Sequence, residues 1–452
     1  MFGCAMEIFI LIFSFLFSVI GFGWELQKAL QNKSFTIISL VGVMFIFTYG
    51  VLPFIVIGAY YWKDISISTK HYQYDYSDIG LMQTLIWEIL GTISYIIIRF
   101  INRNVGSLLS RNNFYTDYSA LQITTFLSLV IGVTCMYLWS MAFGGIQNLI
   151  REASKVRSGF SDVQNRFAFF KHFARVIIIT CFSSLFLYKK KYNKLFNAIL
   201  FIVSLIFSIL FLLANDGRLS TLLFFVVVVF IVFDVFSSGN FSKKRFIFLC
   251  LIGGVGIFFI FKLDSITYYI RFGVLEPKSS RSFIESFMGE FAYVMISGQK
   301  AIDHAETWNW LIFDDILTGL QAWLPSSYKF INSKNIWDYN TLISTTNFVG
   351  QFPCDFISTS LYDFSYFGFA IFGVFWGFVI KRIEYLRTNN TLFSLVCYYS
   401  ISTAFFRIVD YCMLYDFILG IFSIVLYGIV YLIVRLFTCK NKYYRYCGDK
   451  RL

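Results

Sequence analysis

Charged residues are scarce in this sequence. Asp, Glu, Lys and Arg make up 14% of its 452 residues, whereas soluble domains carry about 25%. Hydrophobic residues make up 58% and aromatic residues 21%, so a soluble fold of this composition would have too little polar surface to cover its core. The composition therefore excludes an ordinary soluble protein and predicts a chain embedded in the lipid bilayer.

Several common motifs are also missing. The sequence has no Walker-type glycine-rich loop and no GxGxxG, HExxH or GxSxG motif, so we expect no ATP-driven chemistry within the chain. The nine cysteines form no CxxC pair, and Asp314-Asp315 has no third ligand at a recognisable spacing. We therefore expect no bound metal and no cofactor. A disulfide between Cys354 and Cys412 is left open.

Long apolar runs dominate what is present. A membrane-spanning helix needs roughly 20 apolar residues, and the runs predict an all-α, polytopic helix bundle with about eleven spans. The first run lacks a basic region and a cleavage site, so we expect a retained helix rather than a removed signal peptide. The runs cover residues 6–23, 35–61, 79–98, 119–143, 173–188, 195–213, 219–236, 246–261, 364–380, 392–409 and 413–437.

Lysine and arginine collect in every second loop between these runs. Such loops face the cytoplasm under the positive-inside rule, so we expect an extracytoplasmic N-terminus and a cytoplasmic C-terminus. The net charge of +12 follows from this topology, and we expect no nucleic-acid partner. The basic residues are Lys28, Lys33, Arg99, Arg103, Arg111, Lys189, Lys190, Lys191, Lys194, Lys243, Lys244, Arg245, Lys381, Arg382, Arg387, Lys440, Lys442 and Arg445.

The predicted spans divide the chain into four regions. Residues 1–261 contain the first eight spans and a basic outer loop at 144–172. Residues 262–362 form a large extracytoplasmic loop, in which we expect short helices. Residues 363–438 contain the last three spans, and residues 439–452 form a basic cytoplasmic tail.

The 262–362 segment is too long to be a simple connector. Its seven basic and ten acidic residues give a net charge of −3, and it is rich in aromatic residues, so we expect it to fold against the membrane. An acid beside a histidine is a candidate general base, which singles out Asp303 and His304; the plain alternative is a surface histidine next to an acid. The four tryptophans of this segment fit either sugar stacking or anchoring at the membrane interface: Trp308, Trp310, Trp323 and Trp337.

The 144–172 loop carries the opposite charge. Five basic residues against two acidic residues give +3, and Arg151 and Lys155 lie one helical turn apart. Apolar residues recur there at helical spacing, which predicts an amphipathic helix in the membrane interface. Three partners fit these cations: lipid headgroups, the acidic 262–362 loop, or a diphosphate, whose oxygens suit the guanidinium fork. The apolar residues are Ile146, Leu149, Ile150, Ala153 and Val156.

Two further arginines lie near the ends of spans. Arg218 follows the short turn Asn215-Asp216-Gly217 between two strongly apolar runs. An arginine near bilayer depth is costly unless it is paired or faces a polar cavity, so Arg218 is a candidate site residue, with a bridge to Asp216 or snorkelling as the alternative. Arg407 and Asp410 raise the same question and are spaced to pair with each other.

Three features of the sequence occur together. A Gly217-Arg218 step opens a span after a very short outer turn, and a large outer loop follows two spans later. That loop returns to the membrane through residues 360–364 (SLYDF) and then Phe367-Gly368, which lead into a glycine-rich span. In this combination the chain resembles the Wzy-type oligosaccharide repeat-unit polymerases, which build O-antigen and related surface polysaccharides in bacteria.

The resemblance implies an enzyme of the bacterial plasma (inner) membrane. Such polymerases take undecaprenyl-diphosphate-linked oligosaccharides at the outer face and transfer the growing chain onto the non-reducing end of a new lipid-linked repeat. The diphosphate leaves with the lipid, so no nucleotide is required. Besides this substrate and the bilayer, the resemblance implies a chain-length regulator and a flippase as partners.

This reaction needs cations that stabilise the departing diphosphate and a base that activates the acceptor hydroxyl. The candidates for the base are Glu290, Asp303 and His304. The candidates for contacts with the diphosphate or the glycan are Arg151, Arg157, Arg218, Arg271, Arg281 and Arg407.

Two other functions compete with the polymerase. An O-antigen ligase has a similar layout and the same donor, and differs in its acceptor. A lipid-linked oligosaccharide flippase or another transporter needs charged residues inside the bundle and has little use for a large outer loop. Since the predicted spans are mostly uncharged and no internal repeat is visible, the sequence favours the enzyme.

Overall fold

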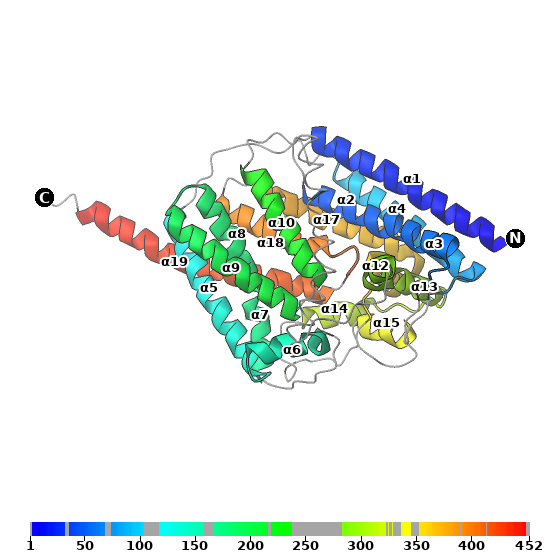
Figure 1. Ribbon diagram of the computed structural model, residues 1–452. Helices are drawn as coiled ribbons and strands as arrows, with labels where there is room; N and C mark the ends of the chain where they lie inside the picture. The colour runs from blue at the N-terminus through cyan, green and yellow to red at the C-terminus, as the bar shows by residue number, and fades with distance from the viewer. Residues whose placement is uncertain are drawn as a thin grey trace.

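The computed structural model describes residues 2–31, 36–67, 74–103, 117–157, 166–215, 218–236, 251, 283–321, 324, 328, 336–344, 352–388, 391–412 and 414–448. Throughout these ranges the secondary structure is helical (Figure 1). The predicted eighth run, 246–261, lies outside the described residues except for Leu251.

The N-terminal and central helices account for the first seven apolar runs. They are α1 (Phe2–Gln31), α2 (Ile37–Ile46), the π-helix η1 (Phe47–Val51), α3 (Leu52–Lys63), α4 (Asp78–Ile101), α5 (Tyr118–Met141), α6 (Ile146–Arg157), η3 (Arg166–Phe170), α7 (Lys171–Ala174), α8 (Val176–Lys189), α9 (Lys194–Asn215) and α10 (Arg218–Phe236).

The second half of the chain alternates short and long helices. They are α12 (Phe283–Phe291), α13 (Tyr293–Ala305), α14 (Ile312–Leu320), α15 (Ile336–Ser344), α16 (Phe356–Phe364), η5 (Ser365–Phe367), α17 (Gly368–Thr388), α18 (Leu392–Phe406) and α19 (Leu414–Gly448). The predicted ninth run begins at a turn between α16 and α17, where Ser365 has a φ of 51°. The predicted cytoplasmic tail continues α19 as far as Gly448.

Among the described residues, eight helical segments are long and apolar enough to cross a membrane. The chain is therefore a polytopic helical membrane protein, which confirms the general class that the sequence predicts. A shorter apolar helix covers Leu392–Thr403. The eight segments are Ala5–Gln31, Ile37–Lys63, Asp78–Ile101, Tyr118–Met141, Lys171–Lys189, Lys194–Asn215, Phe356–Arg387 and Gly420–Thr438.

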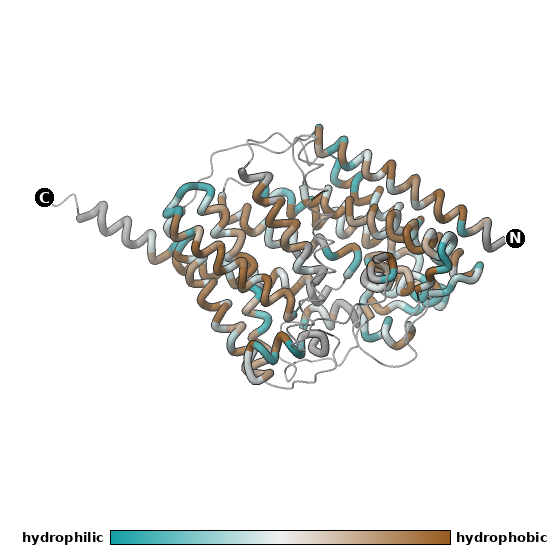
Figure 2. The backbone as a smooth tube through the Cα atoms, in the orientation of Figure 1, coloured by the Kyte–Doolittle hydropathy of each residue, from teal (hydrophilic) through white to brown (hydrophobic). Residues whose placement is uncertain are grey.

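Large apolar side chains remain exposed on these helices, and Figure 2 shows hydrophobic residues, in brown, along most of the length of the long helices. On α1, Phe9, Ile12 and Phe15 are more than half exposed, and Leu436 and Phe437 on α19 are 70% exposed. Exposed apolar stripes of this length are unfavourable in water and suit contact with lipid. These exposed side chains therefore indicate the surface of each span that faces lipid.

Glycines let α17 pack closely against α4. A Cβ at Gly377 would lie 2.8 Å from Cδ1 of Ile101, and one at Gly373 would lie 3.3 Å from Cγ2 of Ile97. The spacing of these glycines is typical of close helix packing in membranes, and α4 is the helix that packs against them.

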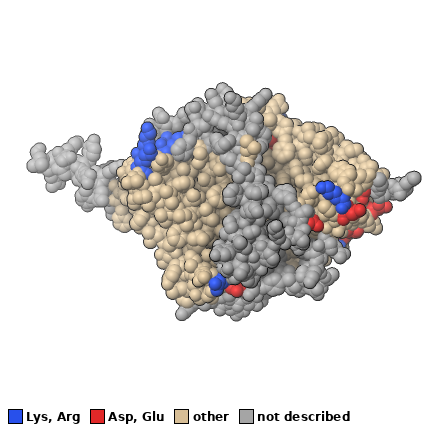
Figure 3. All heavy atoms as spheres, viewed as in Figure 1, with Lys and Arg blue, Asp and Glu red and all other residues tan. Residues whose placement is uncertain are grey.

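The short helices of the 262–362 segment lie at one end of the bundle. In Figure 1, α6, α14 and α15 lie along the lower edge and α12 and α13 lie beside the lower right, whereas the turn between α8 and α9 lies at the upper left. In Figure 3, basic side chains gather at the upper left, where that turn lies, and acidic side chains appear toward the right and lower edges together with further basic ones. Gly298 brings α13 onto α4, because a Cβ there would lie 2.7 Å from the indole of Trp87.

Candidate functional site

Three interruptions of regular α-helix meet inside the bundle. The first is the π-helix η1 within the second span, and the second is the non-helical stretch 352–355 that precedes α16. The third is the connection 407–412 between α18 and α19. π-Helical segments often occur at functional sites, and discontinuous helices form the substrate sites of many membrane proteins.

The second and third interruptions pair with each other through the backbone. The amide of Phe356 donates to the carbonyl of Val409 at 2.9 Å, and the amide of Cys412 donates to the carbonyl of Cys354 at 2.8 Å. Both cysteines are thiols, so the disulfide left open by the sequence is not formed.

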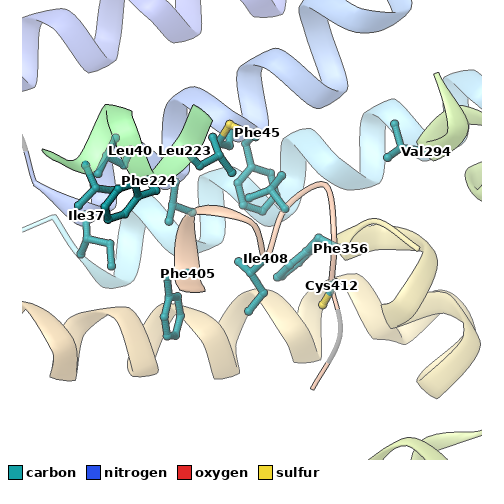
Figure 4. Close-up of a cluster of buried hydrophobic side chains, with 14 of the residues drawn as sticks. Ile37, Leu40, Phe45, Leu223, Phe224, Val294, Phe356, Phe405, Ile408 and Cys412 are labelled. Carbon is teal, nitrogen blue, oxygen red and sulfur yellow. The ribbon is translucent and has the colours of Figure 1, made fainter. Parts of the chain in front are cut away.

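This pair of segments lies deep in the bundle rather than at its end. Phe356 contacts Phe45 of the span Ile37–Lys63 with ring centroids 5.2 Å apart. The amide of Ile357 donates at 3.1 Å to the hydroxyl of Tyr49, which lies near the middle of that span. Figure 4 shows Phe356, Ile408 and Cys412 grouped beneath Phe45. Non-helical backbone at membrane depth is tolerated only where protein surrounds it or where it lines a polar cavity.

Asp355 joins these elements through its carboxylate. One oxygen accepts from the Tyr49 hydroxyl of η1 at 2.6 Å and from the Trp87 indole of α4 at 2.9 Å. The same oxygen accepts from the amides of Ile357 and Ser358 at 3.0 and 3.4 Å, as a helix N-cap does, and the Ser358 hydroxyl donates to the other oxygen. With this many donors, Asp355 acts as a structural anchor.

Asp410 lies in the third interruption, and the surroundings of its carboxyl group differ from those of Asp355. Its side chain is only 3% exposed, and neither carboxyl oxygen accepts a hydrogen bond from the described residues. Arg407 interacts electrostatically with Asp410, and its guanidinium carbon lies 4.0 Å from the centre of the Tyr411 ring. The connection therefore combines a buried carboxyl group with a cation held over an aromatic face.

Two helices of the 262–362 segment complete the surroundings of this connection. Trp337 of α15 packs edge-on against Tyr411, with ring centroids 4.2 Å apart, and the Tyr293 hydroxyl of α13 donates to the backbone carbonyl of Asp410 at 3.0 Å. The buried indole nitrogen of Trp337 has no hydrogen-bond acceptor among the described residues. We call Tyr293, Trp337, Arg407, Asp410 and Tyr411 the Asp410 cluster.

His304, a predicted catalytic residue, is buried in α13, where both of its ring nitrogens are engaged. The Tyr339 hydroxyl lies 2.8 Å from Nδ1, and Nε2 lies 2.8 Å from the carbonyl oxygen of Asn309. Because a carbonyl only accepts, Nε2 carries the proton and Nδ1 accepts from Tyr339. Burial also lowers the pKa of His304, which favours this neutral form. Its contacts fasten α13 to α15, and its catalytic role stays a prediction.

Asp303 lies next to His304 in the sequence but on another face of α13. Its side chain is exposed, lies 3.7 Å from the Lys300 ammonium, and accepts a hydrogen bond from Gln83 of α4. The structure therefore does not bring Asp303 and His304 together as an acid–base pair. Glu290 belongs to α12, and its side chain lies outside the described part.

The predicted binding arginines are spread over the chain. Arg151 is exposed on α6, the helix that the sequence predicts for the 144–172 loop. Arg407 belongs to the Asp410 cluster. Arg157 and Arg218 lie in α6 and α10, but their side chains are outside the described part, as are Arg271 and Arg281 altogether.

From the sequence, we considered Asp410 only as a partner for Arg407 and did not single out Asp355. A usable signal was present for Asp410, since it is the one acid in the 392–412 stretch. No comparable signal marks Asp355, because its partners Tyr49 and Trp87 lie 306 and 268 residues away in the chain.

No family model, curated protein or solved structure matches this chain.

Proposed function

We propose that this protein is a glycosyltransferase that joins polyprenyl-diphosphate-linked oligosaccharide repeat units into a surface polysaccharide, as a Wzy-type polymerase does. The observation that carries the proposal is the Asp410 cluster. It places a carboxyl group, a guanidinium and aromatic side chains at the point where helices of the 262–362 segment enter the bundle.

The chemistry of glycan transfer suits such a cluster. A guanidinium stabilises the negative charge that develops on a departing diphosphate, and a carboxylate accepts the proton of an attacking hydroxyl. Aromatic faces pack against sugar rings. In this proposal Arg407 lies within the site, and Arg151, Arg157, Arg218, Arg271 and Arg281 are candidate contacts for the rest of the lipid-linked substrate.

The proposal includes an orientation in the bacterial plasma membrane. The α8–α9 turn, with its exposed lysines, is at one end of the bundle, and α6 with α12–α15 is toward the other. Under the positive-inside rule the lysine-rich end faces the cytoplasm. In this orientation the lipid-linked substrate reaches the Asp410 cluster from the outer face of the membrane. A flippase would deliver lipid-linked repeats there, and a chain-length regulator would act there.

A flippase is the second candidate, and a specific observation favours it. Buried carboxylates occur within the spans, although the sequence led us to expect a mostly uncharged interior. Glu25 of α1 forms an ion pair with Arg99 of α4, Glu88 accepts from Ser14 at 3.1 Å, and Glu384 of α17 is buried. Ionisable residues inside spans often mark transport pathways.

Reconstitution separates the two candidates. Purified protein in lipid vesicles is supplied with a labelled polyprenyl-diphosphate-linked repeat from the host, without nucleotides. A polymerase produces lipid-linked glycans two or more repeats long and releases polyprenyl diphosphate. Movement of the labelled lipid across the bilayer with no longer product would instead identify a flippase and contradict the proposal.

A further inference from the structure

Asp355 and Asp410 lie in the two paired segments, 352–355 and 407–412, and their carboxyl groups accept different numbers of hydrogen bonds. Asp355 accepts from three side chains and two backbone amides. Asp410 is almost as deeply buried, yet its two carboxyl oxygens accept none from the described residues. Because buried polar groups in native proteins are nearly always hydrogen-bonded, Asp410 has capacity for a donor from outside this part of the chain.

A second unused polar group lies on the other side of Tyr411. The indole N–H of Trp337 is buried and has no acceptor in the described ranges, while its ring packs against Tyr411 at 4.2 Å. The Asp410 cluster thus offers two acceptor oxygens and one donor next to aromatic rings. A sugar presents the complementary groups, because each hydroxyl both donates and accepts and the ring has an apolar face.

The cation in the cluster is held in place by an aromatic ring. Arg407 lies over the Tyr411 face at 4.0 Å, and Tyr411 is itself held by Trp337 and by Tyr293, whose ring centroid is 6.5 Å away. Burial raises the pKa of Asp410 to about 7, and the neighbouring Arg407 guanidinium opposes that rise by favouring the ionised form. Near neutral pH, part of the carboxyl group is therefore ionised and can receive a proton.

The cluster also reaches the surface of the described structure. Arg407 and Tyr411 are partly exposed, whereas Asp410 and Trp337 are buried behind them. The connection is fastened on its inner side, where Phe356 donates to Val409 and the Thr359 hydroxyl donates to the carbonyl of Cys412 at 3.0 Å. A ligand would accordingly approach from the side of Arg407 and Tyr411.

We propose that Asp410 binds the acceptor hydroxyl of the incoming lipid-linked repeat and is the general base of the transfer, with Trp337 and Tyr411 beside the acceptor sugar. This inference rests on the proposed function. Asp410 takes the proton of the acceptor hydroxyl while that oxygen forms a bond to the anomeric carbon of the donor glycan. The bond between the anomeric carbon and the diphosphate oxygen breaks, and its electron pair leaves with the polyprenyl diphosphate. Asp410 then returns the proton to solvent.

A purely structural ion pair between Arg407 and Asp410 is the competing explanation, and it makes different predictions. If Asp410 serves only to neutralise Arg407, Asp410→Asn leaves a partly buried cation without its neutralising charge and lowers the amount of folded protein, and removing both charges together restores that amount. If Asp410 is the base, Asp410→Asn keeps the wild-type amount of folded protein and loses rate per molecule, and the double variant remains inactive because no carboxylate is left to take the proton.

The test compares Asp410→Asn, Asp410→Glu and the double variant R407Q/D410N with wild type and with Asp78→Asn. Asp78 is an exposed acid in the first turn of α4 and serves as the matched control. Each variant is quantified in the membrane, tested for restoring the glycan ladder in a deletion strain, and assayed for the initial rate of polymerisation in vesicles. General-base catalysis is worth about 100- to 10,000-fold in rate.

We expect Asp410→Asn to reach the membrane at the wild-type level and to polymerise at least about 100-fold more slowly, with partial activity in Asp410→Glu. We expect R407Q/D410N to stay inactive and Asp78→Asn to match wild type. Wild-type rates in Asp410→Asn, or recovered activity in the double variant, would overturn the inference while leaving the polymerase proposal intact. If wild-type protein itself neither polymerises nor restores the ladder, it is the proposed function that fails.

Discussion

Replacing Asp355 by alanine tests whether this carboxylate holds the start of α16 against η1 and α4. The substitution removes the acceptor that the Tyr49 hydroxyl and the Trp87 indole share, and it removes the N-cap of α16. The Ser358 hydroxyl also loses its acceptor, but a hydroxyl can rotate toward another partner.

The magnitude follows from counting the groups that lose their partner. The Trp87 N–H is left buried without an acceptor, and the Tyr49 hydroxyl loses its own acceptor while still receiving the amide of Ile357 at 3.1 Å. Each unsatisfied buried donor costs about 1–3 kcal/mol, and the lost helix cap costs about 1 kcal/mol. We therefore expect Asp355→Ala to lower the free energy of unfolding by about 3–7 kcal/mol.

Thermal unfolding in detergent measures this loss through the decline of the monodisperse peak on size-exclusion chromatography. Tyr49→Phe removes one donor together with its hydrogen bond and should lower the midpoint less than Asp355→Ala does. Asp78→Ala is the matched control, because it removes an exposed carboxylate from the first turn of α4. A midpoint for Asp355→Ala equal to that of wild type would refute the anchoring role.

Three further outcomes are expected. Gly298→Leu should strongly reduce the amount of folded protein in the membrane, because even a Cβ there would lie 2.7 Å from a fully buried indole of α4; a normal yield would contradict the close packing of α13. Glu25→Gln and Arg99→Gln should each lower the free energy of unfolding by about 3–5 kcal/mol. In thermal unfolding, the double variant should recover much of that stability, whereas additive losses would argue against a direct ion pair. Reporter fusions after residue 192 should report the cytoplasm and those after residue 330 the outside, and the reverse result would overturn the orientation.

The sequence predicted the membrane class of the fold because long apolar runs have few alternatives. A run such as 119–143 must bury its backbone hydrogen bonds in a helix once it enters lipid, and α5 covers Tyr118–Met141 as expected. The sequence did not predict the π-helix η1, because its residues are as apolar as their neighbours and continue the same run. Local periodicity also does not show that Ser365 ends α16 in a sharp turn before α17.

The candidate site was predicted less completely, because its polar residues acquire their roles from distant partners. The sequence predicted His304 as a candidate general base beside an acid, with an ordinary surface histidine as the alternative. In the structure, Tyr339 and Asn309 engage its two ring nitrogens inside the fold. Arg407 and Asp410 were recognised as neighbours, whereas Trp337 and Tyr293 join them only through the packing of α13 and α15. Contacts between side chains far apart in sequence cannot be read from one chain alone.

The most direct test of the proposed polymerase is the glycan banding pattern of a bacterial host strain from which this gene is deleted. Gel electrophoresis of its lipopolysaccharide should show the ladder reduced to core plus a single repeat, and a plasmid copy of the gene should restore the ladder. Loss of even the single repeat would identify a flippase or a ligase instead, and an unchanged ladder would contradict the polymerase function.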